Sequence, residues 1–264
     1  MVNVLTIPFF DKDIATAVEL VLQVCMEQPE IAEQNPVPNM QLSRCISASG
    51  AHGIIEAYKD PSFKQTLQNF WLNLPDGMPT VWVGRLKGAK LMQRCYGPDF
   101  FKATLLDSAN MPITHFFCGG KEGIAAELQL AVAQKFGNHR VGGVFSPPFR
   151  GMTDEEMAVL GQQITQSGAH IVWIGISTPK QERFAERLAK FVHVKCIITV
   201  GAAFDFHTNR VKQAPKWMQK AGLEWFFRLL MEPKRLYKRY VEIVPLFIWL
   251  NLKEFVEFYI LKKS

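Results

Sequence analysis

The sequence predicts an α/β protein with a Rossmann-like parallel sheet flanked by helices, followed by a basic, amphipathic helical appendage. Between residues 114 and 206, apolar runs typical of strands alternate with amphipathic stretches typical of helices. This alternation is the signature of a parallel sheet with right-handed crossovers. Beyond residue 209 the pattern changes to helical stretches dense in basic and aromatic residues. We therefore expect an α/β domain over residues 1–209 and an appendage over residues 210–264.

The bulk composition is that of a folded intracellular protein. Hydrophobic residues make up 48% and charged residues 20% of the 264 positions, which excludes a mainly disordered chain. The five cysteines are scattered and form no CxxC pair, so we expect reduced thiols in the cytoplasm. Acids precede any apolar stretch of signal length, which argues against export. The longest apolar run, 243–250, falls far short of the roughly 20 residues of a spanning helix.

The first part of the chain predicts three strands of the sheet, and the second and third are each followed by a turn rich in small or acidic residues. After the N-terminal strand, apolar residues recur at helical spacing from near Asp11, which predicts a helix. A later helical stretch is broken at Pro61. A Pro-, Asn- and Glu-rich segment between them indicates a loop. In order, these elements are a strand at 2–10, a helix beginning near Asp11, a loop at 28–40, a strand, turn and helix at 44–70 broken at Pro61, and a strand from 71 that ends at Asp76.

In the second part of the chain, residues 114–206, predicted strands and helices alternate more regularly. Ligands of such sheets bind beyond the carboxyl ends of the strands, so the turns that follow each strand are the places to look for a site. These turns are 47–52, 75–77, 118–123, 145–151, 176–182 and 202–209. The predicted elements are strands at 114–120, 140–149, 170–177 and 194–206, and helices at 121–136, 153–168 and 178–191.

The appendage carries the positive charge of the chain. Residues 210–240 hold nine Lys and Arg against two Glu, whereas the whole chain has a net charge of only +6. Such a segment favours phosphates, anionic lipid or nucleic acid as a partner. Basic amphipathic helices with Trp, Tyr and Phe suit a membrane surface. The alternative is that their apolar face packs on the protein's own body or on a second copy, forming a homo-oligomer.

Asp76 is the first candidate for chemistry. It follows Leu74 and Pro75 at a strand end and precedes Gly77, so its carboxylate is expected to project into the ligand crevice. An aspartate there can act as a general base toward a hydroxyl group within hydrogen-bond reach. The alternative is an aspartate that only caps a turn or a helix.

Two later turns are candidates for phosphate and sugar contacts. The Gly119-Gly120 turn directs backbone N–H groups toward a helix start, although it lacks the full GxGxxG spacing of a dinucleotide site. At 177–184, Thr178 and Pro179 suit the start of a helix, which leaves Gln181 as the side chain available for a sugar or a base.

Metal binding is not expected. Asp11 and Asp13 form a DxD pair, but they lie at a helix start, where acids favourably meet the helix dipole. No two of the six histidines lie at a ligand spacing. His52 and His207 are the histidines that fall on candidate ligand loops.

Several of these segments occur together in an order that resembles the WecG/TagA/CpsF family of bacterial glycosyltransferases. The resemblance covers about residues 2–250, and the 178–182 and 223–240 segments are its most specific parts. The motifs that carry it are LPDG at 74–77, RCYGPD at 94–99, the glycine pair at 119–120, TPKQE at 178–182, VGAAFDF at 200–206, QAPKW at 213–217 and LEWFFRLLMEPKRLYKRY at 223–240.

The resemblance implies an inverting transfer of a sugar from a UDP-sugar to a polyprenyl-diphosphate-linked sugar, for a bacterial surface polysaccharide or cell-wall polymer. It implies no metal and no other cofactor, and a location on the inner face of the cytoplasmic membrane. By motif position, Asp76 corresponds to the proposed general base and Arg94 to the arginine before the GxD motif. The family's appendage supplies active-site arginines that correspond to Arg228, Arg235 and Arg239.

The remaining expected substrate contacts lie on the turns that follow the strands, except Asp99, which belongs to the 94–99 motif. They are Ser49, Gly50, His52, Gly77, Asp99, Gly119, Gly120, Gln181 and Asp205.

The chain also departs from the family pattern. Where a Thr-x-Asn motif is common it has Ala48-Ser49-Gly50, Pro98 replaces a common Thr, and Gln213 replaces a basic residue. Because the first change bears on sugar binding, the donor stays open among an N-acetylmannosamine type, glucose and another hexose. The alternative function is a non-catalytic membrane-surface adaptor that binds a nucleotide or a lipid. We expect no nucleic acid partner, because a nucleic-acid-binding function would leave the 74–77 and 178–182 motifs without a role.

Overall fold

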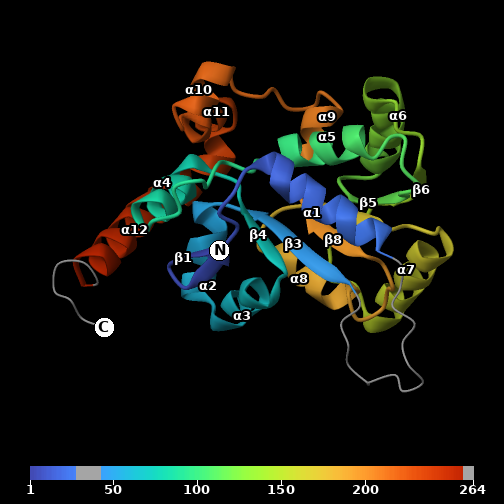
Figure 1. Cartoon of the computed structure of the whole chain (residues 1–264), viewed down its shortest axis with the longest axis horizontal. Helices are drawn as coiled ribbons and strands as arrows, with labels where there is room; N and C mark the ends of the chain where they lie inside the picture. The colour runs from blue at the N-terminus through green and yellow to red at the C-terminus, as the bar shows by residue number, and fades with distance from the viewer. Residues whose placement is uncertain (28–42, 258–264) are drawn as a thin grey trace.

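A computed structural model describes residues 1–27 and 43–257, and it contains the predicted parallel sheet (Figure 1). The loop predicted at 28–40 lies outside the described residues. Six parallel strands run in the order β4-β3-β8-β7-β5-β6. Their bounds are β3 Arg44–Ser49, β4 Leu72–Pro75, β5 His115–Gly119, β6 Val141–Phe145, β7 Ile171–Gly175 and β8 Cys196–Thr199.

Helices cover both faces of the sheet because the central strands are apolar on both sides. On β7, Trp173 packs into the core on one face, while Val172 and Ile174 pack into the core on the other. One layer holds α1 (Ile14–Met26), α5 (Gly97–Asp107), α6 (Ile124–Phe136) and α9 (Ala203–His207). The other holds α3 (Pro61–Asn69), α7 (Asp154–Gln166) and α8 (Lys180–Leu188).

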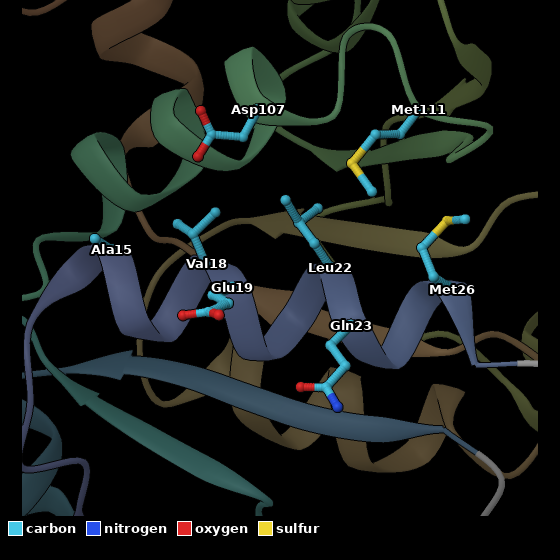
Figure 2. Close-up of a pocket in the computed structure, with 8 residues that line it drawn as sticks. All are labelled: Ala15, Val18, Glu19, Leu22, Gln23, Met26, Asp107 and Met111. Atoms are coloured by element: carbon cyan, nitrogen blue, oxygen red, sulfur yellow. The ribbon is translucent and has the colours of Figure 1, made fainter.

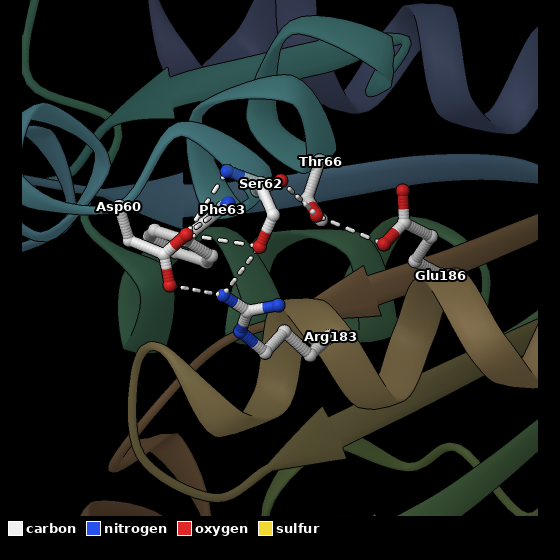
Figure 3. Close-up of polar contacts among 6 residues, drawn as sticks. All are labelled: Asp60, Ser62, Phe63, Thr66, Arg183 and Glu186. Atoms are coloured by element: carbon white, nitrogen blue, oxygen red, sulfur yellow. Dashed lines mark hydrogen bonds and ion pairs between the residues drawn. The ribbon is translucent and has the colours of Figure 1, made fainter.

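A polar cluster joins α3 to α8 (Figure 3). Asp60 caps α3 by accepting hydrogen bonds from the backbone N–H groups of Ser62 and Phe63. The same carboxylate pairs with Arg183, and Thr66 donates to Glu186 at 2.8 Å. These contacts fix the outer helix pair on one face of the sheet.

The predicted strand at 2–10 is wrong as a single element. Residues Val2–Val4 (β1) and Ile7–Phe9 (β2) form a small antiparallel hairpin outside the main sheet. Its two turn residues, Leu5 and Thr6, have φ values of 46° and 73°. A two-residue hairpin turn of this kind usually carries Asn or Gly, and because Leu5 and Thr6 are neither, the sequence gives no turn signal there.

The strand predicted at 194–206 is also too long. It ends at Thr199, and α9 begins at Ala203. Gly201, with φ of 56°, turns the chain, and Phe204 then packs beneath Gly175. Two helices were not predicted: α4 (Met78–Leu86), which follows Gly77, and α5.

Three predicted helix starts lie two or three residues too early, and one of them is that of α6, which begins at Ile124 rather than at residue 121. The first helix begins at Ile14 rather than near Asp11, because Asp13 is its cap and accepts from the backbone N–H of Thr16. The helix predicted from Thr178 begins at Lys180 after Pro179, and the Thr178 hydroxyl donates to Glu182 instead of capping.

The appendage consists of α10 (Lys216–Lys220), α11 (Glu224–Met231) and α12 (Pro233–Phe255), and α12 packs on α2 (Ala51–Lys59). Ile243, Phe247 and Leu250 of α12 join Ile54 and Ile55 of α2 in one apolar cluster. One face of the appendage therefore packs on the protein's own body, which was the alternative considered from the sequence. The boundary at residue 209 stays a prediction.

Ion pairs between Lys59 and Glu242 and between Lys87 and Glu254 add polar contacts along α12. None of the helices within the described residues is both long and apolar enough to span a bilayer.

Candidate active site

A cleft of about 1560 Å³ lies beyond the carboxyl ends of β3, β4, β7 and β8, with α4, α11 and α12 forming its outer wall. This is the place at which parallel sheets bind ligands. Most of the residues predicted from the sequence meet here. Those lining the cleft are Gly50, His52, Asp76, Gly77, Arg94, Gly120, Gln181, Asp205, Arg228, Arg235 and Arg239.

Three predicted residues do not line the cleft. Ser49 is buried at the end of β3, with its hydroxyl 2.7 Å from that of Ser47. Asp99 is exposed in the first turn of α5. Gly119 lies within the sheet, where a Cβ atom would come 2.5 Å from the carbonyl oxygen of Gly175. Its role is therefore to allow close approach of β5 and β7.

Asp76 is held at the mouth of the sheet by contacts from two neighbouring segments. Its backbone N–H donates to the Ser49 carbonyl, and its Oδ1 accepts from the backbone N–H of Gly97 at 2.7 Å. Among the described residues its Oδ2 has no hydrogen-bond partner. Burial raises the pKa of Asp76 to about 6, against the lowering effects of Arg94, the Gly97 hydrogen bond and Arg228. A carboxylate with this pKa and one unoccupied oxygen has the properties of a general base near neutral pH.

Arg94 is fixed beside Asp76 by three contacts. Its Nε donates to the Asp76 carbonyl at 2.6 Å, and an Nη donates to Glu224 at 2.6 Å. Its guanidinium lies over the ring of Tyr96, 4.0 Å from the ring centre. Arg94 therefore connects the β4–α5 segment to the first residue of α11.

Three arginines of the appendage give the cleft a positive wall. Arg235 pairs with Glu232 at 2.6 Å, Arg228 lies 3.8 Å from the same carboxylate, and Arg239 is the third member. The Nε of Arg228 is buried without a partner in the described part of the chain. Several guanidinium donors thus remain for an anionic ligand, and guanidinium groups match the geometry of phosphate oxygens.

The basic residues of α12 separate into two faces. Arg235 and Arg239 line the cleft, whereas Lys234, Tyr237 and Lys238 are exposed and do not line it. The helical turn therefore places Lys238 on a different face of α12 from Arg235 and Arg239.

Residues 2–259 match the sequence model described as the glycosyl transferase WecG/TagA/CpsF family. The chain belongs to this family. A relative from Bacillus subtilis (strain 168), named N-acetylglucosaminyldiphosphoundecaprenol N-acetyl-beta-D-mannosaminyltransferase, is 28% identical over 217 residues, which cover 82% of each chain. The resemblance drawn from the sequence motifs is thereby confirmed, and the protein is a glycosyltransferase.

In this WecG/TagA/CpsF glycosyltransferase, Gln181 belongs to a buried polar network. Its Nε2 donates to Glu182 at 2.9 Å, and its Oε1 accepts from the backbone N–H of Gly201 at 3.0 Å. The Glu182 carboxylate also accepts from Ser47 and Thr178. Burial raises the pKa of Glu182. Both ends of the Gln181 amide are therefore occupied within the protein, and its contact with substrate stays a prediction.

Both glycines of the Gly119-Gly120 turn also have structural roles within the protein. The backbone N–H of Gly120 donates to the Gly175 carbonyl at 3.0 Å. Its φ of 71° lies in the left-handed region that favours glycine. The structure accounts for both glycines without a ligand, and their role in holding a diphosphate stays a prediction.

The two histidines singled out from the sequence have different surroundings. His52 lines the cleft at the start of α2, where burial, with Arg239 and Lys59, lowers its pKa to about 4. His52 is therefore neutral at pH 7. His207 stacks on Phe101 and contacts the Pro98 carbonyl at 2.9 Å, and it does not line the cleft.

The acids of the DxD pair have local partners. Asp13 caps α1, and Asp11 pairs with the N-terminal amine at 2.9 Å. Over residues 1–27 and 43–257, no group of three or more His, Cys, Asp or Glu side chains is arranged to hold a metal ion.

Sequence reasoning missed Tyr96 and Glu224 as residues of the site. Glu224 lies in the 223–240 segment that carried much of the family resemblance, and it is one of only two acids in a basic stretch. That isolated charge was the available signal.

A second hollow of about 470 Å³ lies between α1 and α5 (Figure 2). Ala15, Val18 and Leu22 lie on its α1 side, and Asp107 and Met111 face them. It contains none of the residues predicted for the site and no basic side chain, so the cleft is the stronger candidate.

Proposed function

We propose that the enzyme moves a hexose from a UDP-sugar to a polyprenyl-diphosphate-linked sugar during synthesis of a bacterial surface or cell-wall polymer. The name of the Bacillus relative supports N-acetylmannosamine as donor sugar and a diphosphoundecaprenol-linked N-acetylglucosamine as acceptor. Glucose and other hexoses stay open, because Ala48-Ser49-Gly50 replaces a family motif at the cleft edge.

The proposed chemistry is a single displacement. Asp76 takes the proton of the acceptor hydroxyl as its oxygen forms a bond to the anomeric carbon. The bond from that carbon to the UDP oxygen breaks on the opposite face, which inverts the configuration. Arg228, Arg235 and Arg239 stabilise the charge on the departing diphosphate, a role that a divalent metal fills in other enzymes.

The observation that carries this proposal is the position of Asp76. Its unoccupied Oδ2, its pKa of about 6 and the three arginines of the same cleft together fit a base facing an anionic leaving group. The basic appendage supports contact with the inner face of the cytoplasmic membrane, where a lipid-linked acceptor would lie.

The test is UDP release by the purified protein across a panel of UDP-sugars, with and without a polyprenyl-diphosphate-sugar analogue and in the presence of EDTA. We expect release that depends on the acceptor, uses one donor and persists with EDTA. Loss of activity in EDTA would contradict a metal-independent mechanism.

Asp76→Asn should lower turnover roughly 10²-fold or more, because it removes the general base. Asp107→Asn, which changes an exposed aspartate outside the cleft, is the matched control. Near-wild-type turnover of a folded Asp76→Asn protein would contradict the mechanism. UDP binding without any transfer would favour the rival adaptor function.

A further inference from the structure

Glu224 is a buried carboxylate that the proposed mechanism does not use. It is the first residue of α11, its exposed fraction is 8%, and it pairs with Arg94 at 2.6 Å. A buried carboxylate is costly unless it is paired, and it costs most when its partner is removed. This pair connects the appendage to the segment that follows Asp76.

We propose that Glu224 is a positioning residue for the catalytic base: it holds the Arg94 guanidinium against the Asp76 backbone and balances its positive charge. The inference rests on the proposed function in taking Asp76 as the base. It adds a residue from the appendage that acts on that base through Arg94.

The geometry supports positioning because each part of the Arg94 side chain has a separate contact. Nε is engaged by the Asp76 carbonyl, one Nη by Glu224, and the guanidinium face by Tyr96. Two carboxylates act on Arg94, those of Asp76 and Glu224, and only the Glu224 carboxylate accepts a hydrogen bond from its guanidinium. Without it, the guanidinium keeps its charge next to a buried carboxylate.

The charges near Asp76 determine the direction in which its pKa should change when Glu224 is neutralised. Besides burial, the charged groups that act on Asp76 are Arg94 and Arg228, which lower its pKa, and Glu224, which raises it. The neighbouring Tyr96 phenol is buried, and its pKa is raised well above 10, so it is neutral. Neutralising Glu224 leaves both arginines unopposed, so the pKa of Asp76 should fall and Asp76 should become a weaker base.

The experiment compares the pH dependence of kcat/KM for wild type, Glu224→Gln and Glu242→Gln. Glu242 is the matched control, because it lies on the same appendage and pairs with Lys59 outside the cleft. We expect Glu224→Gln to shift the acid limb about 0.5–1 pH unit lower and to reduce the plateau, since nearby charges change a pKa by that order. Glu242→Gln should leave the limb in place.

A carboxylate of the same charge separates electrostatics from packing. Glu224→Asp should keep the acid limb near its wild-type position even where its plateau falls, and it is the variant to measure if Glu224→Gln does not fold. An acid limb that stays in place in folded Glu224→Gln, or moves equally in Glu224→Asp and Glu224→Gln, would overturn the proposal.

A direct titration distinguishes this inference from the proposed function. The carboxyl signal of Asp76, assigned by comparison with Asp76→Asn in ¹³C NMR, should titrate at lower pH in Glu224→Gln. An active Asp76→Asn enzyme would refute Asp76 as the base and leave this titration interpretable. An unchanged Asp76 titration would refute the electrostatic role of Glu224.

Discussion

Asp76 occupies a position that disfavours the charge it needs for its proposed role. Its pKa of about 6 in the folded chain exceeds the usual value near 3.8, so the folded state binds its proton more tightly than the unfolded state. Stability from this group is fully present below about pH 4 and is lost as the pH rises through about 6. At neutral pH the ionised carboxylate therefore costs stability.

Replacing Asp76 with a neutral residue should restore the stability that the ionised carboxylate removes. Asp76→Asn keeps an oxygen that can accept from the Gly97 N–H, and it should stabilise the fold by on the order of 2–3 kcal/mol at pH 8. Thermal unfolding at several pH values measures it. We expect Tm to rise by several degrees at pH 8, with the gain vanishing near pH 4.

Exposed Asp107→Asn is the control and should change Tm little at either pH. An Asp76→Asn protein that is less stable than wild type at pH 8 would show that the carboxylate is stabilised by its surroundings.

The sequence located Asp76 and, through the family resemblance, Arg94, but it did not indicate that Arg94 pairs with Glu224. A strand that ends in Pro-Asp-Gly places the carboxylate at a sheet edge, and this follows from local pattern alone. The Arg94–Glu224 pair joins residues separated by 130 positions. Only the packing of α11 against the β4–α5 segment brings them together, so no local spacing predicts it.

At the level of elements, the approach of α7 to the end of α8 depends on Gly161. A Cβ atom at this position would lie 2.1 Å from the carbonyl oxygen of Phe191. Because that neighbour is backbone, it cannot be displaced by a change of rotamer. Helix α7 therefore packs closely through a residue without a side chain.

Gly161→Ala should destabilise the protein by about 1–3 kcal/mol, although alanine favours helix formation. Chemical denaturation measures the difference, with Gly151→Ala as control because nothing lies within 4 Å of a Cβ there. Equal stability of the two variants would mean that α7 shifts freely on the sheet.

Helices with regular apolar spacing were predictable as elements, and short turns were not. The alternation over 114–191 predicted β5, β6 and β7 and the helices α6, α7 and α8 as elements in the right order, although β6 ends at Phe145 rather than at residue 149. The hairpin at Leu5-Thr6 and the helix α9 both interrupt segments whose composition predicts a single strand. In both places left-handed backbone, rather than a change of composition, ends the strand.

For the whole molecule, the division of α12 into a cleft face and an outward face leads to a test of membrane binding. Lys234→Ala combined with Lys238→Ala should weaken binding to anionic vesicles about thirtyfold, since each lysine contributes about 1 kcal/mol near such a surface. Turnover with a water-soluble acceptor analogue should be unchanged, because neither residue lines the cleft.

Vesicle sedimentation at two salt concentrations is the measurement. Lys102→Ala combined with Lys190→Ala removes the same charge from exposed positions outside the appendage and is the control. Equal loss of binding in both double variants would mean that attraction is set by net charge and not by the appendage.

The cleft takes its walls from two distant parts of the chain, with Asp76 and Arg94 from one and Glu224, Arg228 and Arg239 from the other. A ribosome makes these parts in sequence. While the polypeptide is still being synthesised, the sheet residues can emerge and fold, but the cleft lacks its basic wall. The basic wall is added only when α11 and α12 have been made and have packed on the sheet, so a growing chain that has not yet reached residue 239 lacks Arg239 and cannot form the complete cleft.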